Sequence, residues 1–213
     1  LEEIKKAVLK HKLIMISDEV YDELTYDFKH VPFASLSGAK NNTLYLNGFS
    51  KSYAMTGWRV GYACGPKEII AAMTKIHQYT IMCVSTISQL ASCEALQGAG
   101  YAVSEMRREY QRRREFVVDG LNRMGLKCLK PQGAFYAFAC IESTALSSMD
   151  FCSGLLKEQK VAVVPGNAFG DSGEGYIRIS YASSLENLRE ALNRIAAFLK
   201  KLEVRSEKLT ERV

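Results

Sequence analysis

A lysine follows directly after a short apolar segment in the first quarter of the sequence. Lys51 lies in NGFSKSYAMTGWRVGY, residues 47–62, just beyond the apolar run TLYLN. Most loop lysines are solvated, but an amine that is buried or has a second cation nearby acquires a lowered pKa and becomes a nucleophile. Arg59, eight residues later, is either that cation, a clamp for an anion, or a surface residue in an ion pair of little energetic consequence.

A second group of reactive side chains follows another apolar run. LIMIS, residues 13–17, is followed by an acid, Asp18, and a phenol, Tyr21. Because open α/β sheets bind their ligands at the carboxyl ends of the strands, Asp18, Tyr21 and Lys51 are expected to converge if both runs belong to one sheet. Residue types alone favour a simpler interpretation, in which Asp18 and Tyr21 cap a turn and Lys51 is a solvated loop residue.

The apolar pattern around these side chains predicts helices that alternate with short strands, which is typical of the α/β class. Gly98 and Gly100 interrupt the pattern and predict a boundary between two domains, 1–100 and 101–213. The predicted strands are 13–17, 43–47, 59–64, 133–140, 161–164 and 176–182, and the predicted helices are 1–12, 66–97, 101–124, 149–160 and a last one from Leu185.

Composition excludes several classes of function. The 213 residues are 47% hydrophobic and 24% charged, as in soluble globular proteins, and a net charge of +5 is too small to indicate a nucleic-acid partner. The arginines between residues 107 and 114 alternate with glutamates at helical spacing, which predicts a solvated, ion-paired helix face. No apolar run in these residues is long enough to cross a membrane, and the pattern at their start predicts a helix and not a signal peptide.

The six cysteines form no CxxC pair and no metal-ligand spacing with the three histidines. They are therefore expected to be reduced core residues of a cytoplasmic protein that holds no metal.

Four segments in this order resemble the class I/II aminotransferases of the fold type I pyridoxal-phosphate family, and in particular its aspartate and aromatic aminotransferase branch. They are SDEVYDELTYD, NGFSKSYAMTGWRVGYACGP, VPGNAFG and GYIRISYA. The Ser-Lys-Ser setting, the Met-Thr-Gly-Trp run and the arginine eight positions after the lysine occur together, and this combination is far more specific than a lone lysine. The resemblance implies part of the large-domain sheet of such a transferase, followed by an α/β carboxyl-terminal small domain, in a three-layer αβα arrangement.

The resemblance also implies roles for the reactive side chains. Lys51 would form a Schiff base with the aldehyde of pyridoxal 5'-phosphate and then move a proton between substrate and cofactor. Asp18 would hold the pyridine nitrogen protonated, and Tyr21 would donate to the phenolic oxygen.

The anionic groups would be bound by arginines. Arg59 would bind the cofactor phosphate, and Arg178, in YIRISYA, would bind the substrate α-carboxylate through its planar fork. Many relatives have a Ser or Thr three positions before the lysine that helps to hold the phosphate. Here that position is Gly48, so Ser50 is the candidate for part of that task.

The implied reaction is the transfer of an amino group from an amino acid to a 2-oxo acid. Two alternatives stay open: a non-catalytic, aminotransferase-like effector domain of a transcription regulator, and a pyridoxal-phosphate-dependent carbon–sulfur lyase. Family members are longer than this sequence, so the resemblance implies that the chain is the carboxyl-terminal half of an enzyme that forms a homodimer. Activity of this half alone is not expected, and neither nucleic acid nor a membrane is an expected partner.

Overall fold

The computed structural model describes residues 1–210, so the last three residues of the predicted second domain lie outside it. The chain divides into two compact units, Leu1–Arg107 and Arg108–Val213, here called unit 1 and unit 2. The sequence-based division into 1–100 and 101–213 remains a prediction about the roles of the two parts.

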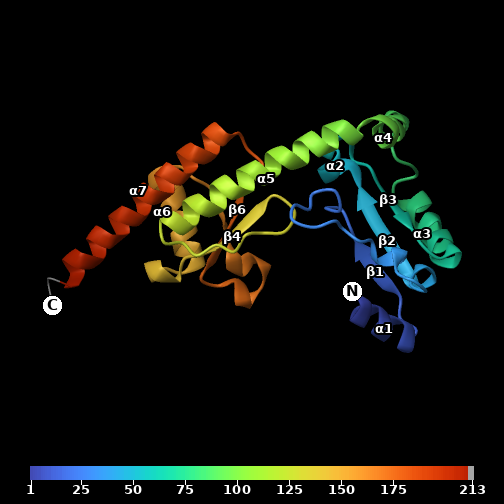
Figure 1. The fold of residues 1–213 in the computed structure, drawn as a ribbon, viewed down its shortest axis with the longest axis horizontal. Coiled ribbons are helices and arrows are strands. Elements are labelled where there is room, and N and C mark those ends of the chain that lie inside the picture. The colour runs from blue at the N-terminus through green and yellow to red at the C-terminus, as the bar shows by residue number, and fades with distance from the viewer. Residues whose placement is uncertain (211–213) are drawn as a thin grey trace. The chain divides into compact units, whose positions relative to one another are not determined.

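Unit 1 is built around a three-stranded sheet of order β1-β2-β3 (Figure 1). β1 (Met15–Asp18) and β2 (Thr43–Gly48) are parallel, and β2 and β3 (Gly61–Cys64) are antiparallel. The predicted strands are confirmed, although β1 begins two residues later than the apolar run that predicted it. The helices of unit 1 are α1 (Glu2–Lys10), α2 (Phe49–Ser52), α3 (Lys67–Thr80) and α4 (Thr86–Gly98), with 3-10 turns at Phe33–Ser35, Lys40–Asn42 and Thr56–Trp58.

The prediction of one helix over 66–97 is wrong, because α3 and α4 are separate helices. α3 ends where Ile81 and Met82 both donate their backbone N–H to the His77 carbonyl, and Met82 takes a left-handed φ of 67° that no α-helix residue adopts. Cys83, Val84 and Ser85 then form the connection, and residues of these types are weak helix formers. The apolar periodicity continues through this break, so it did not reveal it.

Unit 2 has a second three-stranded sheet, of order β4-β6-β5, in which both pairings are antiparallel. β4 (Tyr136–Cys140) and β6 (Tyr176–Ser180) alternate strictly, so Ala137, Ala139, Ile177 and Ile179 are buried on one face. Phe138 and Arg178 lie opposite each other on the other face. The helices of unit 2 are α5 (Gly100–Arg123), which begins in unit 1, α6 (Ser148–Gln159) and α7 (Leu185–Thr210), and the third strand is β5 (Val164–Pro165). The buried face of the sheet joins the main core with α5, α6 and α7.

The arginine-rich part of α5 differs from the prediction at one residue. Glu109 pairs with Arg112 and Arg113 at the surface, as the spacing predicted. Arg114, however, is completely buried, and its guanidinium donates a 2.9 Å hydrogen bond to the Pro131 carbonyl. Arg114 shares a helical stripe with Val117, which belongs to the core, and this position explains its burial.

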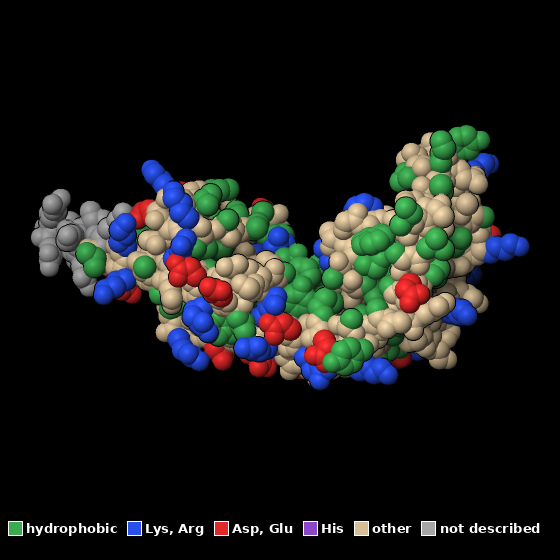
Figure 2. Space-filling view, turned by 90° about the horizontal axis from the view of Figure 1, so that it is seen from above, with side chains coloured by type: hydrophobic (Ala, Val, Ile, Leu, Met, Phe, Trp, Pro, Cys, Tyr) green, Lys and Arg blue, Asp and Glu red, His purple; other side chains and the backbone are tan. Residues whose placement is uncertain are grey.

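Unit 1 buries far less apolar surface than unit 2. Its core cluster consists of Val8, Phe33 and Ala39, with two partly buried neighbours. α3 buries no residue, and α4 buries only two serines. Many hydrophobic side chains of the protein therefore reach the surface (Figure 2), and those of this region include Ile16, Ile76, Tyr79, Ile87 and Leu90.

The same exposure corrects the prediction for the cysteines. All six are free thiols, but only Cys128 and Cys152 are buried, whereas Cys64, Cys83 and Cys93 are exposed. Burial raises the pKa of the Cys152 thiol to about 11, which keeps this thiol protonated and unreactive. Among residues 1–210, none of the helices combines the length and the apolar character that a membrane span requires.

Candidate functional site

Three of the sequence-predicted residues, Asp18, Tyr21 and Lys51, lie at or just after the carboxyl ends of β1 and β2. Asp18 ends β1 and stands beside Leu46 in the parallel register with β2. Lys51 lies in α2, the single helical turn that begins immediately after β2, so it follows the carboxyl end of the neighbouring strand. Its Nζ atom is 6.0 Å from the centre of the Tyr21 ring. The structure therefore places the Lys51 amine near the Tyr21 ring, while the roles of these residues stay a prediction.

Aromatic packing fixes the backbone of α2. Phe49, one residue after β2, is 3% exposed, and its ring centroid is 5.2 Å from that of Tyr53 and 5.7 Å from that of Tyr62. A helix of one turn has almost no stability of its own, so its position depends on such tertiary contacts. Lys51 itself is partly buried, which differs from the solvated loop residue that residue types alone suggested.

Arg59 and Ser50 are connected through Thr56. The Arg59 guanidinium donates to the Thr56 carbonyl at 2.9 Å, and the Thr56 hydroxyl donates to the Ser50 carbonyl at 2.9 Å. Arg59 has a left-handed backbone, with φ 52° and ψ 52°, which is uncommon for a residue other than glycine. Its side chain is exposed and available to an anion.

A carboxylate that the sequence analysis did not select, Asp22, accepts four hydrogen bonds. Its Oδ2 atom accepts from Asn47 Nδ2 at 2.7 Å and from the Tyr45 hydroxyl at 3.2 Å. Its Oδ1 atom accepts from the Glu23 N–H at 2.8 Å and from the Ser52 hydroxyl at 3.2 Å. Alternation along β2 places Tyr45 and Asn47 on one face, and this polar pair at a strand end was the one signal in the sequence that could have indicated the network.

Glu19 fixes the loop between Asp18 and Tyr21 from the other side. Its side chain is 6% exposed, and its carboxylate accepts from Ser17 Oγ at 2.8 Å, from the Phe33 N–H at 3.0 Å, and contacts His30 Nε2. Asp18, by contrast, is exposed, and its carboxylate accepts from the Val20 N–H at 3.3 Å. Glu19 thus holds the backbone while the Asp18 side chain faces outward.

The tyrosines around this network are held in their protonated form. Burial, with a further contribution from the Asp22 charge, raises the pKa of Tyr45 far above its ordinary value, although the Asn47 hydrogen bond opposes the shift. Burial likewise raises the pKa of Tyr53 and of Tyr62. Tyr45 therefore acts as a hydrogen-bond donor to Asp22 over the whole neutral range.

The remaining predicted residue, Arg178, lies in unit 2 at the centre of β6. Its Cζ atom is 4.3 Å from the centre of the Tyr136 ring and 4.5 Å from that of Phe169. Tyr136 comes from β4, which pairs with β6, and Phe169 ends the turn Gly166–Phe169 that follows β5, so one ring comes from a neighbouring strand and the other from a turn. The guanidinium is partly buried against aromatic surface, an environment that favours a fixed orientation.

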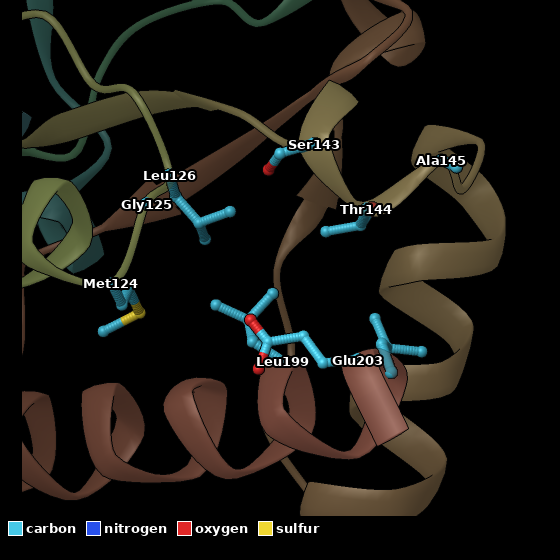
Figure 3. Close-up of a pocket in the computed structure, with 9 residues that line it drawn as sticks. Met124, Gly125, Leu126, Ser143, Thr144, Ala145, Leu199 and Glu203 are labelled. Carbon is cyan, nitrogen blue, oxygen red and sulfur yellow. The ribbon is translucent and has the colours of Figure 1, made fainter. Parts of the chain in front are cut away.

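A separate pocket of ≈ 460 Å³ in unit 2 contains none of the predicted site residues (Figure 3). Met124 and Leu126, from the turn after α5, converge there with Leu199 of α7, and Glu203 supplies a carboxylate. Apart from this exposed acid and the hydroxyls of Ser143 and Thr144, the lining is apolar or backbone, and it contains no lysine, arginine, histidine or cysteine, so the candidate site is elsewhere.

Comparison with known proteins gives the family. The model of "Aminotransferase class I and II" matches residues 1–195. An aspartate aminotransferase of Pyrococcus abyssi is 49% identical over 213 residues, which cover 99% of this chain and 54% of that protein. An aromatic-amino-acid aminotransferase of Thermococcus litoralis is 48% identical over 203 residues, or 94% of this chain and 52% of that protein.

A solved structure gives the same result for the fold. The aromatic aminotransferase from Pyrococcus horikoshii matches with a TM-score of 0.92 and 49% identity, over 95% of this chain and 55% of that one. The predicted α/β transferase-like fold is thereby confirmed. The chain spans about half the length of the curated relatives it matches. With a family model matched over most of its length and close agreement with a solved structure, this chain belongs to the class I and II aminotransferases.

Proposed function

We propose that these residues form part of a pyridoxal-phosphate-dependent enzyme that transfers the amino group of an amino acid to a 2-oxo acid. The observation that carries the proposal is the position of Lys51, whose amine lies 6.0 Å from the Tyr21 ring at the carboxyl ends of β1 and β2. A partly buried amine beside a phenol, with an exposed carboxylate at the adjacent strand end, is a set of groups suited to an aromatic aldehyde cofactor.

The residues present fit the chemical groups of pyridoxal 5'-phosphate. Lys51 can attach to its carbonyl carbon, and Tyr21 can donate to its phenolic oxygen. Asp18, with an accessible carboxylate, is suited to a protonated ring nitrogen, and Arg59 and Ser50 to the phosphate. When bound, the cofactor supplies an electron sink for the negative charge that develops at the substrate α-carbon.

In this proposal the chain's own residues orient groups and move a proton. The Lys51 amine, once free of the cofactor, would take the proton from the substrate α-carbon as a general base and would later give a proton back as a general acid. Asp18 would keep a cationic ring nitrogen protonated through the charge of its carboxylate. Arg178 binds the α-carboxylate, which every amino acid and 2-oxo acid substrate has in common.

Further partners are part of the proposal. The exposed apolar side chains of α3 and α4 and of the β1 edge form a surface of the kind that other protein usually covers. We assign that surface to the rest of a longer polypeptide and to a second subunit of a homodimer. A cytoplasmic location is supported by the six free thiols, which a reducing compartment preserves.

Covalent labelling tests the proposal. The complete protein that contains these 213 residues is incubated with pyridoxal phosphate, reduced with borohydride, digested and mapped by mass spectrometry. The cofactor is expected on Lys51, and Lys51→Ala should abolish the label while Lys67→Ala, a change at an exposed lysine of α3, should not. Label on a different lysine, or none in a folded protein, would refute the assignment.

A further inference from the structure

The segment that carries Tyr21 and the segment that carries Lys51 are joined through one carboxylate. Asp22 directly follows Tyr21, and Ser52 directly follows Lys51. The Ser52 hydroxyl donates to Asp22 Oδ1 at 3.2 Å, across 30 residues of sequence. This hydrogen bond therefore connects the residue next to Tyr21 with the residue next to Lys51.

The same carboxylate also attaches both segments to the sheet. Asn47 and Tyr45, near the carboxyl end of β2, donate to Asp22 Oδ2, and the two donors contact each other. Asn47 further accepts from the Gly48 N–H at 2.6 Å, at the residue that precedes α2. Since β2 is the central strand of the unit 1 sheet, these bonds fix the Tyr21 turn and α2 relative to one rigid element.

The buried position of these side chains makes the loss of a hydrogen bond to Asp22 costly. Ser52 is 1% exposed and Asp22 is partly buried, so a donor left without its acceptor here would lose a hydrogen bond that water cannot easily replace. Each of the two Asp22 oxygen atoms accepts two hydrogen bonds. A carboxylate can accept at both atoms, whereas an asparagine side chain would place an NH₂ group opposite two of these donors.

We propose that Asp22 is a positioning residue of the candidate site, and that it sets the separation between the Tyr21 phenol and the Lys51 amine by binding the segments that carry them. It touches neither the reacting atoms nor the cofactor, and it acts through its neighbours. The inference rests on the proposed function for the identity of the ligand, while the linkage between the two segments is a property of the chain itself.

The main experiment is a spectroscopic cycle on the complete protein. The pH midpoint of the absorbance of bound pyridoxal phosphate is measured for wild type, Asp22→Asn, Tyr21→Phe and the double variant. Asp22→Asn is expected to shift the midpoint in the same direction as Tyr21→Phe, by about half a pH unit or more, because the phenol is no longer held in place. The double variant is expected to match Tyr21→Phe alone, since both changes remove the same interaction.

Two further variants separate positioning from general destabilisation. Ser52→Ala removes only the link to α2 and leaves the other three donors of Asp22 in place, so it should give a smaller shift in the same direction. Glu23→Gln, at the adjacent exposed carboxylate, should give none. If Asp22→Asn and Ser52→Ala lower the melting temperature but leave the midpoint at the wild-type value, Asp22 is only structural and the proposal is overturned.

A measurement without cofactor shows whether a negative result contradicts the role of Asp22 or the proposed function. The rate of reductive methylation of Lys51 relative to Lys67 is followed by mass spectrometry in cofactor-free protein. Asp22→Asn should increase this ratio at least ~3-fold, because a loosened α2 exposes Lys51, whereas Glu23→Gln should not. An unchanged ratio overturns the inference. An increased ratio in a protein that never binds pyridoxal phosphate supports the inference and rejects the proposed cofactor.

Discussion

Replacement of Arg178 gives the sharpest test of how the substrate is held. In β6 the guanidinium lies 4.3 Å from the Tyr136 ring and 4.5 Å from the Phe169 ring. Under the proposed function, we expect Arg178→Ala in the complete protein to raise KM for every amino acid tested, because the α-carboxylate would lose its charged partner. The spectrum of the bound cofactor should remain unchanged.

The magnitude follows from the burial of this side chain. Removing one member of a desolvated, hydrogen-bonded charge pair costs about 2–5 kcal/mol. Arg178 is only partly buried in the free protein, so solvent screening favours the lower end, about 2–3 kcal/mol or roughly a 30- to 150-fold loss of affinity. Arg178→Lys keeps the charge but loses the planar fork and its contact with the two rings, so it should lose about 1–2 kcal/mol.

Steady-state kinetics with an acidic, an aromatic and an aliphatic amino acid measure the effect, and the absorbance of the bound cofactor is recorded for each variant. Arg189→Ala is the control, because this exposed arginine of α7 lies 5.8 Å from the Phe116 ring and has no assigned role. Loss of cofactor from Arg178→Ala would place this arginine at the phosphate instead. A change in KM confined to acidic substrates would mean that it recognises a side-chain carboxylate.

Two further predictions concern carboxylates in the two units. Asp18→Asn in the complete protein should leave the melting temperature within a few degrees of the wild-type value. It should reduce turnover by about 10²-fold or more, because the charge proposed to hold a ring nitrogen protonated is lost. Near-normal turnover with reduced stability would show that Asp18 only caps a turn. In unit 2, hydrogen bonds from Ser148 and Gly175 lower the pKa of the Glu174 carboxyl below its ordinary 4.5, so its stabilising contribution is present above pH 4.5 and is lost as the pH falls through the lowered value. Thermal melts between pH 3 and pH 7 should therefore show a shallower acid loss of stability for Glu174→Gln than for wild type.

Local sequence patterns were sufficient for most strands and for the reactive side chains at their ends. Alternation and apolar runs placed β1, β2, β4 and β6 correctly to within a few residues, because side-chain periodicity within a strand is a local property. The Asp18, Tyr21 and Lys51 positions follow from the same patterns, since each lies just after an apolar run.

Contacts between distant residues could not be predicted in this way. The periodicity of residues 66–97 did not reveal the turn at Met82, because a left-handed residue changes the direction of the chain without changing its composition. The arginine run gave no sign that Arg114, unlike Arg112, lies in the core. Its burial depends on the Pro131 carbonyl, 17 residues away in sequence.

By itself, then, the sequence determined most of the strands and helices and which side chains stand at the strand ends, because these depend on neighbours along the chain; the break between α3 and α4 and the bounds of β5 are exceptions. Only the tertiary structure decided how those side chains are held. The four donors of Asp22 come from three separate segments, and the rings beside Arg178 come from a strand and a turn far apart in sequence. Hydrogen bonds and ring contacts of this kind depend on distances in space, which are fixed only when the sheet has formed and its strands are in register.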